Sequence, residues 1–164
     1  MGDFRKILVA LSLEKYSKGI FDYAARLAQS LNAQLIVANI INSRDVQAVA
    51  KITSWGYEVD SEHYIKGVTE ERGKVMNQII KESSFPTEKI KTVFKVGNPV
   101  DELLKMTLEE EVDMIVMGVK GRTDLQHAFV GSVADKIFRR SPVTVISYRD
   151  EKHADHLKKH IHLK

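Results

Sequence analysis

The sequence contains no cysteine and no long hydrophobic run, and each absence excludes a class of protein. Without cysteine there are no disulfides, thiolate metal sites or cysteine nucleophiles. The N-terminal MGDFRKILVALSL lacks the basic segment, the long apolar segment and the cleavage site of a secretory signal. No stretch approaches the ~18 apolar residues of a transmembrane helix. We therefore expect a cytoplasmic protein with no membrane partner.

Outside the C-terminal tail, positively and negatively charged residues are nearly balanced. The formal net charge is +3, and much of the excess lies in the last residues. A mixed-sign surface does not indicate a nucleic-acid partner. The 164 residues, 43% of them hydrophobic, suit one domain with a sizeable core. We expect this domain to span residues 1–149, followed by a basic, histidine-containing tail over 150–164.

The tail carries histidines at helical spacing, His153, His156 and His160, with His162 beyond them. Imidazoles placed on one face of a helix can bind Zn²⁺ or Ni²⁺. No carboxylate partner is evident in the sequence, so we expect a partly ordered tail and no metal site.

Short apolar runs alternate with amphipathic segments along the chain. The runs predict strands over 5–13, 34–41, 90–97, 113–117 and 142–148, the third being the most polar and closest to an edge. Helical periodicity predicts helices over 17–32, over a short segment before Gly56, and over 59–82, 98–112 and 125–140. This alternation implies an α/β fold, a parallel sheet covered by helices on both faces.

Local signals mark several helix ends. Ser17 and Asn98 are candidate N-caps, Pro99 suits a first helical turn, and Asn32 is a candidate stop. Trp55 is expected to cover the core or a partner helix, as is its neighbour Tyr57.

Three glycines gather after the fourth predicted strand: Gly118, Gly121 and Gly131, the last followed by Ser132. Ligands of open parallel sheets bind at the carboxyl ends of the strands. Glycines there let backbone amides approach a ligand, and a helix start favours an anion. The segment thus suggests a phosphate cradle. Neither G-x-G-x-x-G after the first strand nor G-x4-G-K-[ST] is present, and simple turn glycines are the alternative by spacing alone.

The spacing Gly118-x2-Gly121-x9-Gly131-Ser132 resembles the G-x2-G-x9-G-[ST] motif of ATP-binding universal stress proteins. KILVALSLEKYSKGIFDYAARLAQSLNAQLIVANII and GSVADKIFRRSPVTVIS also resemble the first and last parts of that family's domain. The resemblance implies a single-domain open sheet of five parallel strands in the order 3-2-1-4-5. It also implies a regulatory protein that binds ATP, with or without Mg²⁺ or Mn²⁺.

The resemblance further implies which residues contact the nucleotide. The base would lie against the ends of the first two strands, and the ribose and phosphates against the glycine segment. The implied contacts are Ala10, Leu11, Ser12, Ile40, Met117, Gly118, Gly121, Arg122, Gly131, Ser132 and Val133. For Arg122 a phosphate contact and a solvated loop charge are both open.

Two positions depart from the family pattern. Relatives usually have an aspartate where this chain has Ser12, and often a hydroxyl residue where it has Ala134. Both changes favour an alternative function, a dimeric interaction module that binds no nucleotide. No nucleophile stands beside an evident base, so we expect no catalytic residue and at most slow ATP hydrolysis.

The last predicted strand, SPVTVISYR, has apolar residues on both faces. In the order 3-2-1-4-5 it lies at an edge of the sheet, where unpaired backbone groups can accept another strand. Many relatives dimerise through this strand. We therefore expect a homodimer through Val143, Val145 and Ile146.

Overall fold

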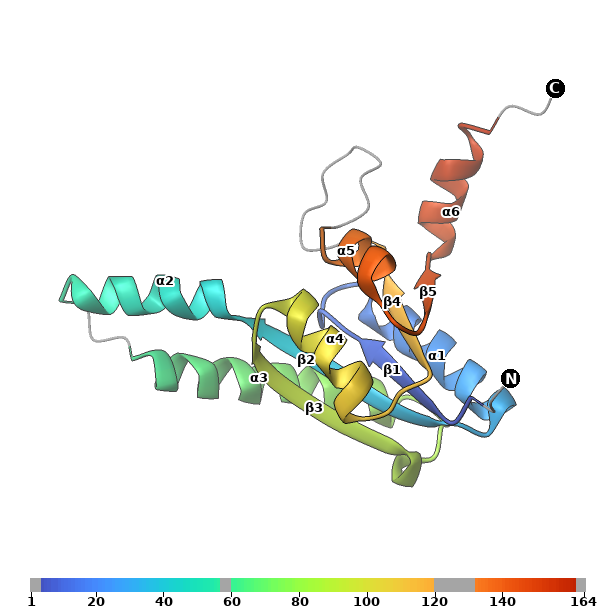
Figure 1. The fold of residues 1–164 in the computed structure, drawn as a ribbon, viewed down its shortest axis with the longest axis horizontal. Helices are drawn as coiled ribbons and strands as arrows, with labels where there is room; N and C mark the ends of the chain where they lie inside the picture. Colours follow the sequence, from blue (N-terminus) through green and yellow to red (C-terminus); the bar gives the residue numbers. More distant parts are fainter. Residues whose placement is uncertain (1–3, 57–59, 120–131, 162–164) are drawn as a thin grey trace.

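A computed structural model describes residues 4–56, 60–119 and 132–161, and its centre is a parallel sheet (Figure 1). The sheet contains five strands, β1 (Lys6–Ala10), β2 (Gln34–Asn42), β3 (Ile90–Gly97), β4 (Met114–Gly118) and β5 (Thr144–Tyr148). Their order is β3-β2-β1-β4-β5, with every neighbouring pair parallel. The predicted α/β class and strand order are confirmed.

Four of the described helices cover the two faces of this sheet. The helices are α1 (Ser17–Leu31), α2 (Ser43–Ser54), α3 (Ser61–Lys81), α4 (Pro99–Glu109), α5 (Ser132–Arg140) and α6 (Glu151–Lys158), with a 3-10 turn over Thr87–Lys89. Buried residues of α1 and α3 pack on one face, and those of α4 and α5 pack on the other. The β1 strand lies in the middle, so its three central residues, Ile7 to Val9, are buried from both sides.

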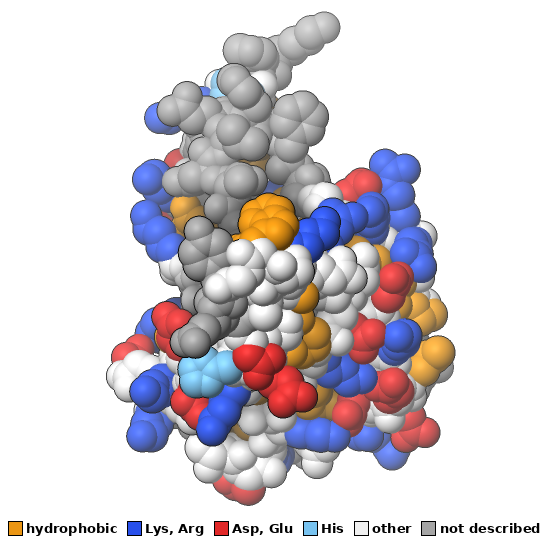
Figure 2. Space-filling view, turned by 90° about the vertical axis from the view of Figure 1, so that its left-hand side faces the viewer, with side chains coloured by type: hydrophobic (Ala, Val, Ile, Leu, Met, Phe, Trp, Pro, Cys, Tyr) orange, Lys and Arg blue, Asp and Glu red, His pale blue; other side chains and the backbone are white. Residues whose placement is uncertain are grey.

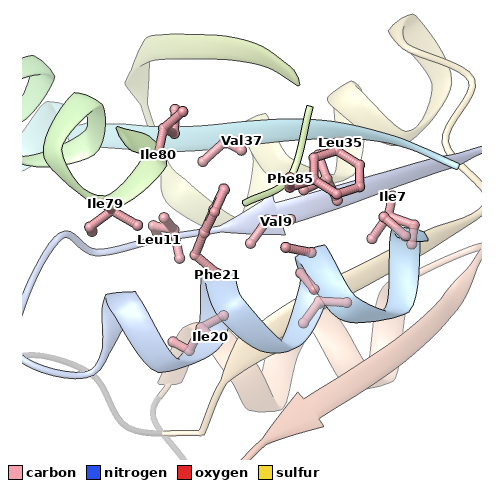
Figure 3. Packing of buried hydrophobic residues seen from close by; sticks show 14 of the residues in the cluster. Ile7, Val9, Leu11, Ile20, Phe21, Leu35, Val37, Ile79, Ile80 and Phe85 are labelled. Atoms are coloured by element: carbon pink, nitrogen blue, oxygen red, sulfur yellow. The ribbon is translucent and has the colours of Figure 1, made fainter. Parts of the chain in front are cut away.

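The α1/α3 face holds the larger hydrophobic cluster, which is drawn in Figure 3. Phe21 of α1 is fully buried against the sheet beside Val9 and Val37, and Ile79 and Ile80 of α3 close the cluster. Burial of each such side chain contributes about 1.5–3 kcal/mol. Because α1 follows β1 directly, this packing also fixes where the β1–α1 connection lies.

The α4/α5 face holds a second cluster. Met106 of α4 and Ile137 of α5 are fully buried against Leu8 and Ile115 of the two central strands. Successive residues of a strand point to opposite faces, so each central strand contributes side chains to both clusters. Because both faces of β1 and β4 are buried, these strands are apolar at consecutive positions.

Helix ends follow the local signals in most places. The Asn98 side chain accepts hydrogen bonds from the amides of Val100 and Asp101, with Pro99 in the first turn, as predicted. Asn32 ends α1 in the left-handed conformation, with φ of 53°.

Two helix starts differ from the sequence prediction. Ser17 is the first residue of α1 and not its cap; its Oγ accepts a hydrogen bond from the amide of Glu14, before the helix. The α3 helix starts at Ser61, two residues after the predicted start. The reason is that the Asp60 side chain caps it by accepting from the amide of Glu62.

The α2 and α3 helices form an antiparallel pair that extends beyond the sheet (Figure 1). Trp55 follows the last residue of α2 with 75% of its surface exposed. Of its two predicted roles, covering the core is therefore wrong, and covering a partner helix stays a prediction. Tyr57 lies outside the described residues. Figure 2 views the molecule from this side and shows basic and acidic side chains interspersed among small hydrophobic areas.

The C-terminal part differs from the prediction in two places, the start of the last strand and the tail. The β5 strand starts at Thr144, two residues after Pro142, and α6 forms in the expected tail. In Figure 1 this helix runs away from the sheet. The side chains of His153 and His156, and all of His162, lie outside the described part of the chain. Within the described ranges, no helix combines the length and the hydropathy needed to cross a bilayer.

Candidate functional site

The carboxyl ends of β1, β2 and β4 meet at one edge of the sheet. Ala10 at the end of β1 is level with Ala38 of β2 and with Met117 of β4. The chain winds outward from β1 to β2 and β3, and then crosses to β4 on the other side of β1. Such a reversal leaves a crevice beyond the strand ends, the usual ligand position of open α/β sheets.

The predicted contacts divide between the two faces of the sheet. Ala10, Ile40, Met117 and Val133 all belong to the α4/α5 cluster or pack against it. Leu11 points to the opposite face, where its side chain is buried in the α1/α3 cluster. The first four therefore share one face of the strand ends, and only the backbone of Leu11 is near them.

The residues after β1 form a turn above this edge. The Leu11 amide donates to the Ala38 carbonyl at 2.9 Å, which extends the pairing of β1 with β2 by one residue. Ser12 follows with an exposed side chain. Its hydroxyl is therefore accessible to a ligand at the strand ends.

A buried hydrogen bond from β2 supports this turn, and it was not among the sequence predictions. Asn39 of β2 is 2% exposed, and its Nδ2 donates to the Leu11 carbonyl at 2.8 Å. The Arg72 guanidinium of α3 donates to Asn39 Oδ1 at 2.9 Å. One signal was present in the sequence, since Asn39 interrupts the apolar run QLIVANII. For Arg72 no local signal exists.

The glycine at the end of β4 has a packing reason. Gly118, predicted to be the first residue of the turn, is instead the last residue of the strand. A β-carbon added there would lie 2.8 Å from Cδ1 of Ile20, in α1. Glycine at this position therefore allows α1 to approach the strand end.

Comparison with known proteins identifies the chain. The model of the universal stress protein family matches residues 3–149. This chain belongs to the universal stress protein family. Universal stress protein MJ0577 of Methanocaldococcus jannaschii is 26% identical over 158 residues, which cover 90% of this chain and 97% of that protein. YxiE of Bacillus subtilis is 27% identical over 150 residues, covering 89% and 99%.

Solved structures show the same fold. The structure of MJ0577 aligns with a TM-score of 0.68 at 24% identity, covering 92% of this chain and all of that one. A universal stress protein in complex with cAMP aligns with a TM-score of 0.59 at 22% identity, covering 90% and 98%. One from Archaeoglobus fulgidus in complex with dAMP gives 0.60 at 17% identity, covering 90% and 100%.

The family motif is only partly within the described residues. Gly118, Ser132 and Val133 are described, whereas Gly121, Arg122 and Gly131 lie outside. Ser132 is the first residue of α5 and is exposed. The first amides of a helix have no partner within it and, with the helix dipole, favour an anion.

The Ala134 departure has a structural reason in this universal stress protein. Ala134 is 3% exposed within the α4/α5 cluster. A hydroxyl there would have to be hydrogen-bonded to offset its desolvation.

The predicted nucleotide contacts that the structure describes are aliphatic residues, a methionine, a glycine and two serines. Such a set can bind a ligand through its backbone and hydroxyls but holds no general base.

Proposed function

We propose that this universal stress protein binds an adenine nucleotide, ATP with or without Mg²⁺ or Mn²⁺, and acts as a regulator in the stress response. The site is the carboxyl edge of β1, β2 and β4. The observation that carries the proposal is the common level of Ala10 and Met117, at the carboxyl ends of β1 and β4. They lie next to β2, and they share a hydrophobic cluster with the first turn of α5.

The chemistry of this edge supports a nucleotide. Aliphatic side chains on the α4/α5 face, Ala10, Ile40 and Met117, suit a base and a ribose. Ser132, the start of α5 and the motif glycines suit phosphates. Two proteins of the same fold are bound to cAMP and to dAMP, which supports an adenine base.

The absence of a base among the predicted contacts favours binding over catalysis. Hydrolysis needs a group that orients or deprotonates water, and serine and glycine supply none at neutral pH. We propose that bound nucleotide is retained as a signal. Mass spectrometry of small molecules released from the denatured protein tests this point: ATP supports retention, ADP or AMP indicates turnover, and no nucleotide favours the interaction module.

A substitution in the motif tests the site itself. Gly131→Val adds a side chain where the motif requires backbone, so the ATP dissociation constant should rise at least tenfold, about 1.4 kcal/mol. Titration calorimetry measures it. Gly67→Val is the matched control, because a β-carbon at Gly67 in α3 meets open space. A folded Gly131→Val protein that binds ATP as tightly as the Gly67 variant would refute the site.

We also propose that the protein is a homodimer through β5. Val143 and Val145 pack against the α4/α5 cluster and Ile146 packs against the α1/α3 cluster, so these three residues tie the strand to both faces. In the part of the chain that the structure describes, no further strand pairs with the outer backbone edge of β5. An antiparallel copy of the same strand would pair with this edge about a two-fold axis.

A further inference from the structure

The turn after β1 contains a backbone conformation that an ordinary residue rarely adopts. Leu13 has φ of +63°, in the left-handed region. Its side chain is partly buried against the α1/α3 cluster, and this packing stabilises the unusual backbone conformation. Strained residues persist only where their surroundings hold them, and they gather at binding sites. The turn lies where the proposed site meets β1.

Both ends of this turn are held by hydrogen bonds. At the start, the Leu11 amide donates to Ala38 and the Leu11 carbonyl accepts from Asn39 Nδ2 at 2.8 Å. At the far end, the amide of Glu14 donates to Ser17 Oγ at 3.1 Å. Ser12 lies between the two ends with its side chain exposed.

The hydrogen bond from Asn39 to the Leu11 carbonyl depends on the orientation of the Asn39 amide, which a residue of α3 fixes. Asn39 can support Leu11 only with its nitrogen toward the carbonyl, since its oxygen would repel it. Arg72 of α3 donates to the Asn39 oxygen at 2.9 Å and so selects this orientation. Because Asn39 is buried, solvent cannot replace the guanidinium without cost.

We propose that Arg72 is a positioning residue for nucleotide binding, acting through Asn39 on the turn from Leu11 to Leu13. Arg72 holds the turn in the shape in which Ser12 and the backbone beside it meet the base and ribose. The proposal rests on the proposed function. It differs from a phosphate contact, because Arg72 reaches the α1/α3 side of the sheet and the predicted base-lining side chains lie on the α4/α5 side.

The test is Arg72→Met with two measurements. In the free protein, the amides of Leu11 and Glu14 are hydrogen-bonded to Ala38 and Ser17. Their hydrogen exchange should become about tenfold faster, because the turn loses its support. The ATP dissociation constant should rise about tenfold, by the same factor at low and at high salt, since an effect on shape is not screened. Arg72→Lys retains one donor and should recover part of the affinity.

Asn39→Asp separates the two contacts. The carboxylate still accepts from Arg72, but it presents an oxygen to the Leu11 carbonyl, so the turn should loosen as much as in Arg72→Met. Lys74→Met is the matched control. It removes one positive charge from an exposed position of the same helix, two residues away. It should change neither exchange in the turn nor ATP affinity.

Two results would overturn the proposal. One is a folded Arg72→Met protein with unchanged exchange and unchanged ATP affinity. The other is a loss of affinity that shrinks at high salt, which would make Arg72 a direct charge contact. If the unmodified protein bound no ATP, the proposed function would fail, whereas the exchange measurement would still decide whether Arg72 holds the turn.

Discussion

The two edges of the sheet are built in opposite ways. The β3 edge is eight residues long and carries Lys91 and Lys95, both paired with glutamates of the α4 segment. The β5 edge is five residues long and contains no charged residue. Charged side chains discourage a second strand from adding to an edge, whereas an apolar edge allows it. The contrast indicates that one edge is closed and the other is available.

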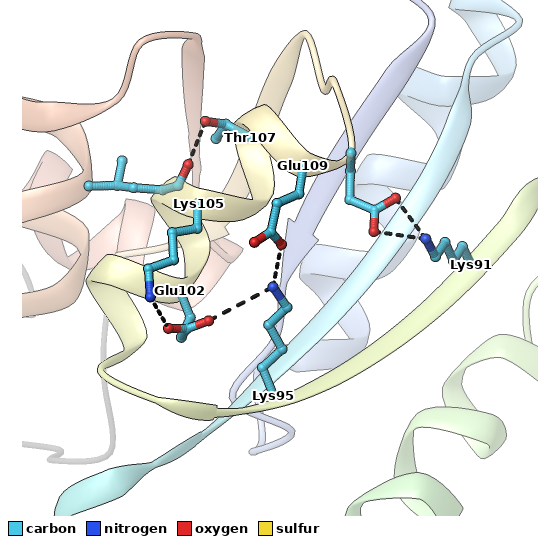
Figure 4. A network of polar contacts seen from close by, with 8 residues as sticks. Lys91, Lys95, Glu102, Lys105, Thr107 and Glu109 are labelled. Atoms are coloured by element: carbon cyan, nitrogen blue, oxygen red, sulfur yellow. Dashed lines mark hydrogen bonds and ion pairs between the residues drawn. The ribbon is translucent and has the colours of Figure 1, made fainter.

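The ion pairs along β3 form two groups, a network around Lys95 and a separate pair at Lys91 (Figure 4). Lys91 bonds Glu110 at 2.7 Å, while Lys95 lies between Glu102 and Glu109. Glu102 also accepts from Lys105 at 2.7 Å, within α4. The glutamate run at positions 109–111 is thus used in part to anchor the lysines of β3. Each pair contributes little to stability alone, so we assign the network mainly to closing the edge.

The β5 edge is held from both faces without such charges. Tyr148 contacts Tyr23 of α1 with ring centroids 5.5 Å apart. A β-carbon at Gly19 would lie 3.0 Å from the Tyr148 hydroxyl oxygen, so α1 approaches this strand closely. This attachment of β5 to its own domain would keep the strand in place in the proposed dimer.

The largest effect is expected from charge placed on β5. Val145→Lys should bring two like charges together near the two-fold axis and raise the dimer dissociation constant by two orders of magnitude or more, about 2.7 kcal/mol. Thr144→Lys, at an exposed position, does the same without removing a packed side chain. Thr92→Lys on β3 is the control and should leave the dimer intact. Sedimentation at micromolar concentration measures all three; a dimeric Thr144→Lys protein would place the interface elsewhere.

A smaller effect is expected when the closed edge is opened. Lys95→Val removes a charge from β3 and leaves an apolar side chain between Phe94 and Val96 on the outer strand. Dimers with a second available edge should associate further, so light scattering should show species above the dimer that grow with concentration. Lys105→Val disrupts the same network on α4, away from the edge, and should not associate. Equal behaviour of the two variants would argue against edge closure.

The smallest effect concerns one proton. The hydrogen bond to Glu102 raises the pKa of Lys105 above 10.5, with further help from the Glu102 charge. A raised pKa adds stability that is present below pH 10.5 and is lost as pH rises through the folded-state pKa. In Glu102→Gln the Lys105 pKa should fall toward its ordinary value, which NMR titration of the lysine side chain can follow. An unchanged pKa would mean that the pair does not persist in solution.

Much of the fold could be predicted from local sequence. The bounds of β3, the Asn98 cap with Pro99, and the stop at Asn32 follow from short-range rules, because each depends on neighbours in the chain. The strand order was predicted by family resemblance and confirmed by the structure. The predicted cap of α1 was wrong, because Ser17 is the first residue of the helix and accepts from the amide of Glu14 before it.

The candidate site divides in the same way. Its glycines, Ser12 and Ser132 could be identified because the motif is contiguous along one segment or lies at a predicted strand end. The link from Arg72 through Asn39 to Leu11 could not be identified. Its members are 33 and 28 residues apart, and only the packing of α3 against the sheet brings them together.

The sequence alone therefore determined the succession of strands and helices, the glycine spacing and the apolar final strand, since each is written in residues that are neighbours or recur at a fixed period. Tertiary structure alone decided which face each site residue occupies, that Gly118 lies close to Ile20, and which lysines meet which glutamates on β3. These depend on distances between segments far apart in the chain, and such distances are set by how the helices pack on the sheet.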